Sequence, residues 1–108
     1  MASPLLTEKE KASAKEKIPN WEFDGKRLRR QWTFKDFIEA FAFITQIAII
    51  SEKMNHHPEW SNTYSKVTID LTTHDSGGIT RLDIDLALSI DRIEETYVTR
   101  KITYTNKS

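Results

Sequence analysis

The chain has 108 residues, enough for one compact domain with a single core, and its 16 basic and 16 acidic residues give a formal net charge of zero. A neutral chain has no overall field that attracts nucleic acid, so direct binding to duplex DNA is disfavoured. The absence of cysteine excludes a disulfide framework, a thiolate zinc site and a cysteine nucleophile. No apolar run approaches the ~20 residues needed to span a bilayer, and the first residues lack a signal-peptide core. We therefore expect a cytoplasmic or nuclear protein without direct contacts to nucleic acid or membrane.

The N-terminal part predicts a short helix followed by a hairpin. Thr7 and Glu10 have the spacing of a capping box, which opens a charged helical stretch that Ile18-Pro19 should end. Asp24-Gly25 then supplies turn chemistry between two strand-like pieces. These two pieces cover residues 21–23 and 26–32.

A long helix is predicted over residues 33–54. Thr33 and Asp36 repeat the capping-box spacing, and apolar side chains recur at helical intervals behind them. Between Phe41 and Ile50 the apolar residues run nearly all the way round, which is wider than packing on one sheet face requires. We therefore expect a second buried contact, most simply self-association through this helix.

After this helix the pattern predicts a turn and then a half-buried strand. Pro58 pushes His57 out of the helical region, so the chain must turn there. From Tyr64 to His74 apolar and polar residues alternate, which predicts a strand with His74 at its end on the polar side. The residues at 75–78 then form a flexible turn.

The last part of the chain predicts a second packed helix. Thr80 and Asp83 give a third capping box, and apolar residues follow at helical spacing to Ile93. The tail from Tyr97 is rich in threonine, tyrosine and valine, and either adds an edge strand or remains loose.

Strands and helices that alternate with short connections predict an α+β fold, in which an antiparallel sheet carries its helices on one face. We treat the chain as one domain. Its parts are an N-terminal helical segment at about 1–19, a core at 20–96 and a C-terminal extension at 97–108.

The three histidines of the chain are candidates for acid–base chemistry. Glu52 and His56 are four residues apart near the end of a helix, and His57 follows directly. His74 ends a strand and Asp83 opens a helix, and ends of elements that converge at one edge of a sheet commonly form a pocket. Imidazoles accept and donate protons near neutral pH, and carboxylates hold them in the required tautomer. With no nucleophile evident, the set suits an elimination, an isomerisation or a hydration.

Each of these residues also has a purely structural interpretation. Two adjacent histidines are often polar surface, His74 can simply cap a strand end, and the Asp83 carboxylate can serve only the helix N-terminus. Trp60 is either an aromatic wall of the pocket or an anchor in the core or an interface. Two histidines and a carboxylate also ligate iron or zinc, so Glu52, His56 and His74 form an alternative metal site. We rank it below acid–base work because the histidine spacing matches no compact metal motif.

One stretch of the sequence is recognisable. The run EKMNHHPEWSNTYSKVTIDLTTHDSGGITRLDIDLA resembles the pterin-4a-carbinolamine dehydratase family, also known as the dimerisation cofactor of a homeodomain transcription factor. The signature of that family is an acidic residue, three positions, two histidines and a proline, then an aromatic residue, a histidine and an aspartate at set distances. Every position is met, by Glu52, His56, His57, Pro58, Tyr64, His74 and Asp83. The resemblance extends upstream to Trp21 and downstream to Ile93.

The resemblance implies an enzyme that dehydrates 4a-hydroxytetrahydrobiopterin to quinonoid dihydrobiopterin, in the recycling of tetrahydrobiopterin. It implies a four-stranded antiparallel sheet with helices on one face, assembled as a homodimer or homotetramer, and it implies no metal and no organic cofactor. Family members in animals also bind the dimerisation helix of a transcription factor through the surface they use to form tetramers. An interaction module is therefore the alternative function.

The resemblance also implies roles for the candidate residues. His56 and His74 are expected to be the acid–base pair, in undetermined order, with His57 positioning the pterin. Glu52 and Asp83 are expected to orient and polarise the imidazoles. Besides the three histidines, the residues expected to bind the substrate are Asn55, Pro58, Trp60, Thr72, Thr73 and Asp75.

Overall fold

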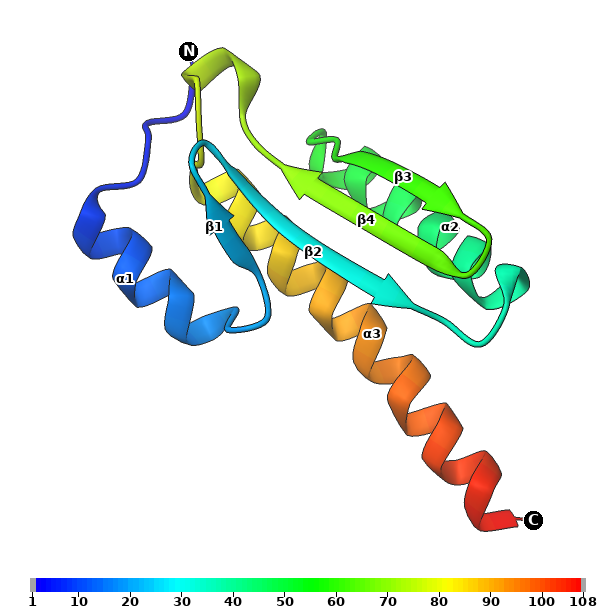
Figure 1. The fold of residues 1–108 in the computed structure, drawn as a ribbon. Coiled ribbons are helices and arrows are strands. Elements are labelled where there is room, and N and C mark those ends of the chain that lie inside the picture. Colours follow the sequence, from blue (N-terminus) through cyan, green and yellow to red (C-terminus); the bar gives the residue numbers. More distant parts are fainter. Residues whose placement is uncertain (1, 108) are drawn as a thin grey trace.

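The computed structural model describes residues 2–107, with side chains described for residues 2–97, and it shows a sheet covered by helices (Figure 1). In chain order the elements are α1 (Glu8–Lys17), β1 (Glu22–Asp24), β2 (Arg27–Thr33), α2 (Phe37–Met54), β3 (Glu59–Thr63), β4 (Lys66–Leu71), the short 3-10 helix η1 (His74–Ser76) and α3 (Arg81–Lys107). The four strands form one antiparallel sheet in the order β1-β2-β4-β3.

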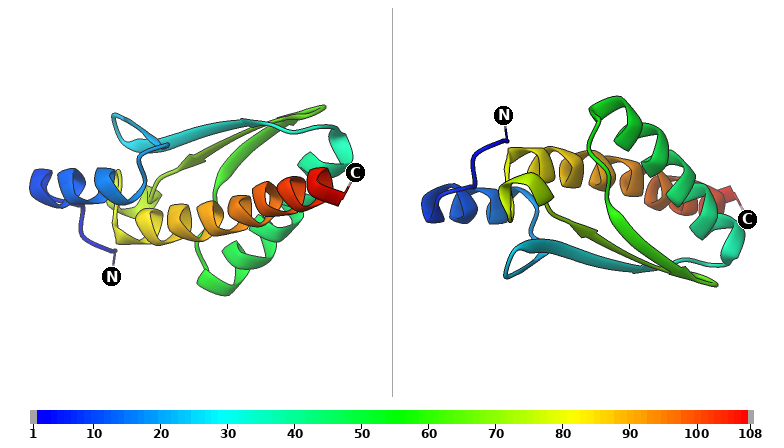
Figure 2. Two further views of the ribbon diagram at one scale, coloured as in Figure 1. Left: turned by 90° about the horizontal axis from the view of Figure 1, so that it is seen from below. Right: turned by 90° about the horizontal axis from the view of Figure 1, so that it is seen from above.

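The helices α2 and α3 lie on one face of this sheet, and no element of the described chain covers the other face (Figure 2). The predicted α+β class, with a four-stranded antiparallel sheet and helices on one face, is confirmed. Among the described residues, no helix combines the length and the apolar character needed to cross a membrane.

The N-terminal helix and the hairpin follow the prediction closely. The Thr7 hydroxyl accepts the Glu10 backbone N–H at 3.1 Å, and the Glu10 carboxylate accepts the Thr7 N–H at 2.9 Å, so the capping box is complete. The helix ends at Lys17, immediately before Ile18. In the hairpin, Gly25 adopts φ 63°, a left-handed conformation that suits glycine in a tight turn.

The long helix α2 starts later than predicted. Its N-cap is Asp36, whose carboxylate accepts the Glu39 backbone N–H at 2.9 Å. Thr33 is instead the last residue of β2, where it pairs with Lys66 of β4. The prediction of a helix from residue 33 is therefore wrong. Thr33 has a side chain that could cap a helix, but its backbone pairs with β4 instead.

The strand predicted from residue 64 to residue 74 is shorter than expected. Tyr64 sits in the turn between β3 and β4 at φ 52°, and β4 ends at Leu71. His74 begins η1 and is not the end of a strand. The sequence pattern also gave no sign of β3, because its side chains are largely exposed and show no alternation of buried and exposed positions.

The tail is helical, so both predictions for it, an edge strand and a loose segment, are wrong. The helix α3 continues through Tyr97 to Lys107. The Tyr97 ring lies 5.9 Å from the rings of both Phe34 and Phe43, and its hydroxyl donates to Gln46 Oε1 at 2.8 Å. At Tyr97, packing against the core thus outweighs the local preference of tyrosine for strands.

The core lies between the inner face of the sheet and the two long helices. Trp32 packs between Trp21 and Phe43, with ring centroids 5.7 Å and 5.0 Å away. The remaining fully buried side chains of the core include Leu28, Ile47, Val67, Ile69, Leu71, Leu86 and Ile90. This packing fixes the ends of β4 and α2 and the start of α3 relative to one another, and these ends carry the three histidines and Asp83.

The side of α2 that faces away from the core is apolar and exposed. Its large apolar side chains are 46–77% exposed, namely Phe37, Ile38, Phe41 and Ile49. The wide apolar girdle predicted for this helix is therefore present, with one part buried in the core and the other open to solvent.

Candidate active site

All three histidines line one cleft at the edge of the sheet. The cleft has a volume of about 310 Å³, near the lower end of the range for pockets that hold small molecules. Its walls come from the loop after α2, the segment after β4 and the first turn of α3. The lining residues are Asn55, His56, His57, Thr72, Thr73, His74, Asp75 and Leu82.

The end of α2 delivers the first two histidines to the cleft. Asn55 adopts the left-handed conformation, with φ 52° and ψ 41°, and its N–H is donated to the Glu52 and Ser51 carbonyls. The next N–H, that of His56, is donated to the Ser51 carbonyl at 3.1 Å. This C-cap reverses the chain within one residue, so the side chains of His56 and His57 leave the helix in different directions.

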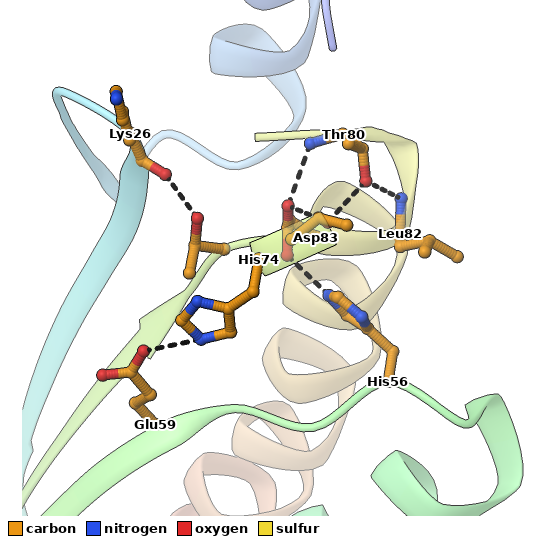
Figure 3. Close-up of polar contacts among 9 residues, drawn as sticks. Lys26, His56, Glu59, His74, Thr80, Leu82 and Asp83 are labelled. Carbon is orange, nitrogen blue, oxygen red and sulfur yellow. Dashed lines mark hydrogen bonds and ion pairs between the residues drawn. The ribbon is translucent and has the colours of Figure 1, made fainter. Parts of the chain in front are cut away.

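His56 forms a buried pair with Asp83 across 27 residues of sequence. His56 Nε2 lies 2.6 Å from Asp83 Oδ1, and the two residues are 9% and 0% exposed. Figure 3 shows the His56 ring reaching from the loop after α2 towards the start of α3. A carboxylate accepts and does not donate, so it holds the proton of His56 on Nε2 and leaves Nδ1 for the cleft.

Asp83 also caps α3 with its other carboxylate oxygen. Asp83 Oδ2 accepts the backbone N–H of Thr80 at 2.9 Å, and the Thr80 hydroxyl accepts the N–H of Leu82 at 3.2 Å. Asp83 Oδ2 also accepts a hydrogen bond from the Thr73 hydroxyl at 2.9 Å. The capping role of Asp83 is therefore present in the structure, and its other oxygen contacts His56, so the predicted role in orienting that imidazole stays a prediction.

His57 pairs with Glu52 at the surface. His57 Nε2 lies 2.7 Å from Glu52 Oε1, and both side chains are exposed. The spacing of four residues favoured a contact between Glu52 and His56 on one helix face. That contact does not form, because the left-handed Asn55 ends the helix before His56 is reached.

The carboxylate partner of His74 is one that sequence reasoning missed. His74 Nε2 lies 3.0 Å from Glu59 Oε1, and both side chains are exposed (Figure 3). Glu59 opens β3 and is paired with Asp70 of β4, which brings its side chain towards the segment that follows β4. The residues of β3 show no alternation of apolar and polar positions, so the strand could not be predicted. The position of Glu59 directly after Pro58 was the one signal that could have pointed to it.

Two residues expected to bind the substrate do not line the cleft, namely Pro58 and Trp60. Trp60 lies in the edge strand β3 and is partly exposed. Conversely, Leu82 lines the cleft, although it is not among the residues expected to bind the substrate. It provides an apolar wall that a flat ring system can lie against.

The residues of the alternative metal site do not come together. Glu52 is paired with His57, and His74 is paired with Glu59. Within the part of the chain that the structure describes, no three histidine, aspartate or glutamate side chains are placed so that they can hold a metal ion. The site instead consists of three separate pairs of a histidine and a carboxylate.

Comparison with known proteins gives consistent matches. The family model described as pterin 4 alpha carbinolamine dehydratase matches residues 4–93. A protein of Prochlorococcus marinus (strain MIT 9303), whose name places it among the pterin-4-alpha-carbinolamine dehydratases, is 51% identical over 94 residues, which cover 87% of this chain and 98% of that one. A protein of Synechococcus sp. (strain WH7803) with the same name is 52% identical over 93 residues, covering 86% of this chain and 99% of the relative.

Solved structures point the same way. The crystal structure of a transcriptional coactivator/pterin dehydratase from Brucella melitensis superposes with a TM-score of 0.79 at 40% identity, covering 82% of this chain and 97% of that one. A pterin dehydratase-like protein, described as a RuBisCO assembly factor in the alpha-carboxysome, has a TM-score of 0.59 at 23% identity, which shows a common fold alone. Since the family model spans most of the chain and the curated relatives are covered almost completely, the chain belongs to the pterin 4 alpha carbinolamine dehydratase family.

Proposed function

We propose that this protein is a hydro-lyase that dehydrates 4a-hydroxytetrahydrobiopterin to quinonoid dihydrobiopterin, as a step in the recycling of tetrahydrobiopterin. The observation that carries this proposal is the arrangement of three histidines around one cleft, each with a carboxylate at Nε2. Membership of the family supports the class of reaction.

The reaction needs one acid and one base. A proton is delivered to the hydroxyl on C4a, the C4a–O bond breaks and water leaves, while a second proton is removed from a ring nitrogen. The two proton transfers balance, so the net product besides the dihydropterin is one water. Imidazoles perform both transfers near neutral pH, and a positioned acid or base typically contributes about 10²–10⁴-fold in rate.

His56 and His74 are the acid–base pair in this proposal. They line the same cleft and reach it from different elements, His56 after α2 and His74 after β4. Asp83 and Glu59 hold their Nε2 atoms, which leaves Nδ1 of each ring to exchange a proton with the pterin.

The remaining lining residues bind and orient the ring in this proposal. His57, held by Glu52, contacts the polar edge of the pterin, as do Asn55 and the backbone of the segment from Thr72 to Asp75. Leu82 packs against the face of the ring. A few polar groups beside an apolar wall is the usual composition of a site for a flat heterocycle.

An activity assay on single variants tests the proposal. We expect His56→Ala and His74→Ala each to lower the enzyme-dependent rate of dehydration of freshly generated 4a-hydroxytetrahydropterin by about 10²–10⁴-fold. The spontaneous dehydration is subtracted, and Lys66→Ala, an exposed change on β4 outside the cleft, serves as the control. Unchanged rates in both histidine variants contradict the assignment.

Homo-oligomer formation is also part of the proposal. The apolar side of α2 exposes two aromatic rings, Phe37 and Phe41, with centroids 5.6 Å apart, and the large aliphatic side chains of Ile38 and Ile49. Burying one such side chain is worth about 1.5–3 kcal/mol, so a symmetric contact between copies of this helix is strongly favoured.

The same surface favours a second candidate function, an interaction module that binds the amphipathic helix of a transcription factor. The oligomer of such a module dissociates when its subunits bind the foreign helix. The oligomer of a protein that acts only as an enzyme keeps its mass in solution when that helix is added. Light scattering with and without a synthetic amphipathic dimerisation helix distinguishes the two functions.

A further inference from the structure

Two threonine hydroxyls form a buried chain behind His56. Thr73 Oγ1 lies 2.9 Å from Asp83 Oδ2 and 2.7 Å from Thr80 Oγ1. Thr73 is only 7% exposed, and Thr80 is fully buried, as is Asp83. At this depth each hydroxyl must find its partners within the protein, because an unsatisfied buried polar group is costly.

Counting hydrogens gives this chain a direction. The Thr80 hydroxyl oxygen accepts the Leu82 N–H, and its own single hydrogen points to Thr73 Oγ1. Thr73 in turn donates its hydrogen to Asp83 Oδ2, which also accepts the Thr80 N–H. With two donors on Oδ2, the carboxylate plane is fixed and Oδ1 is left to accept from His56 Nε2.

The contribution of Thr73 goes beyond capping α3. The cap is complete with the two bonds between Thr80 and the first turn of the helix, whereas Thr73 belongs to the segment after β4. The backbone of Thr73 is itself held by Gly78, through N–H to carbonyl bonds of 2.9 Å and 3.3 Å. Thr73 thus connects a rigid loop to Asp83, and it directly precedes His74.

We propose that Thr73 is a positioning residue for His56. Its hydroxyl, aligned by Thr80, fixes the plane of the Asp83 carboxylate and thereby the tautomer and the orientation of the His56 ring. The inference rests on the proposed function, in which His56 exchanges a proton with the pterin. In this proposal the Thr73 hydroxyl acts from behind His56, through its contact with Asp83, and does not touch the substrate.

The test compares Thr73→Val, which keeps the shape and removes the hydroxyl, with Thr73→Ser, which keeps the hydroxyl. We expect Thr73→Val to lower kcat about tenfold with little change in KM, since a misdirected base loses part of its 10²–10⁴-fold contribution while the pterin contacts remain. Thr73→Ser is expected to restore most of kcat. The matched control is Thr68→Val on β4, outside the cleft and the hydroxyl chain.

A readout that does not depend on activity is the imidazole N–H signal of His56. A proton in a buried 2.6 Å contact exchanges slowly and is visible by NMR in ¹⁵N-labelled protein. We expect this signal to shift and broaden in Thr73→Val and to keep its position in Thr73→Ser and Thr68→Val. Should Thr73→Val fail to fold, Thr73→Ala replaces it in both measurements.

The outcomes separate the two proposals. A wild-type protein without dehydratase activity overturns the proposed function, and the inference about catalysis falls with it. An active wild type whose Thr73→Val variant keeps both kcat and the His56 signal overturns the inference alone. Equal losses of kcat in Thr73→Val and Thr73→Ser also overturn it, because the hydroxyl is then not the cause.

Discussion

Glu59 Oε1 lies 3.0 Å from His74 Nε2, at the surface end of the candidate active site. The equivalent contact of His56, with Asp83, is 2.6 Å long and buried. The two histidines proposed to share the acid–base work are therefore held in the same way but in different surroundings. Water screens the exposed pair and allows it to move, whereas the buried pair is fixed by two further hydrogen bonds to Asp83 Oδ2, from Thr73 and Thr80.

The first prediction concerns this exposed pair. Glu59→Gln removes the charge and keeps the shape, and we expect kcat to fall by at most about fivefold, because exposed ion pairs contribute little. Steady-state kinetics in the His74→Ala background should show no further loss, since Glu59 then has no imidazole to orient. Glu22→Gln is the control. Glu22 lies in the row of residues paired across the strands that also contains Glu59, and it is not paired with a histidine. An equal effect of Glu59→Gln with and without His74 contradicts the pairing.

The second prediction concerns the buried pair. In Asp83→Asn the amide can donate to His56 Nε2, which stabilises the wrong tautomer, and we expect kcat to fall by about a hundredfold or more. The free energy of unfolding should also fall by about 1–3 kcal/mol, because the buried bonds to Thr73 and Thr80 are weakened. Both quantities are measured by kinetics and urea titration.

Asp85→Asn is the matched control for this substitution. Asp85 lies on the same helix two residues later, and its side chain makes an exposed contact with Arg81 at 3.4 Å. We expect it to keep both activity and stability. Equal turnover in Asp83→Asn and Asp85→Asn would mean that Asp83 has no part in the reaction.

The sequence predicted the identities of most cleft residues but not the pairs they form. Capping boxes, turn residues and alternation are local signals, and they correctly predicted α1, the hairpin and the existence of the half-buried β4, though not its ends. The choice of partner is not local. Glu52 and His56 have the spacing of a helical pair, yet one left-handed residue between them, Asn55, directs Glu52 to His57.

The same limitation explains the missed strand and the wrong tail. An edge strand such as β3 buries almost nothing, so its sequence carries no periodicity, and Glu59 is hidden with it. In the tail, strand-forming residues follow a helix whose last described side chain, Tyr97, is held by Phe34, Phe43 and Gln46. At Tyr97 these contacts, with residues more than 50 positions away, favour the helix, and no local window of sequence contains them.

The third prediction concerns the exposed apolar side of α2. We expect the wild-type protein to have a mass in solution that is a multiple of the 12.6 kDa chain, and Phe41→Glu to reduce it towards one chain. A charge in a buried apolar contact costs several kcal/mol, which is enough to dissociate a small interface. Light scattering measures the mass. Lys53→Glu, a charge change on an exposed residue of the same helix, should leave it unchanged.

The fourth prediction concerns the pH dependence of stability through Asp70. Its carboxylate accepts Nε and Nη2 of Arg29 at 2.7 Å and 3.0 Å and Nη1 of Arg27 at 3.4 Å. The hydrogen bonds from Arg29 are the main cause that lowers the pKa of Asp70 below its ordinary value of 3.8, against the opposing effect of burial. The unfolded chain therefore binds more protons than the folded one between these two pKa values, so stability rises with pH in that window.

This sign gives a specific expectation for Asp70→Asn. The stabilisation that the carboxylate provides is fully present above pH ~5 and is lost as the pH falls through the lowered pKa of Asp70. Urea titrations between pH 7 and pH 2.5 should therefore show wild type more stable than the variant at neutral pH, with a difference that shrinks in acid. Asp24→Asn is the control, because Asp24 lies on β1, which is not paired with β4, and makes none of these three contacts. A difference between wild type and Asp70→Asn that stays constant across the whole range would show that the Arg29 pair contributes nothing through the charge of Asp70, because only its titration can make the difference depend on pH.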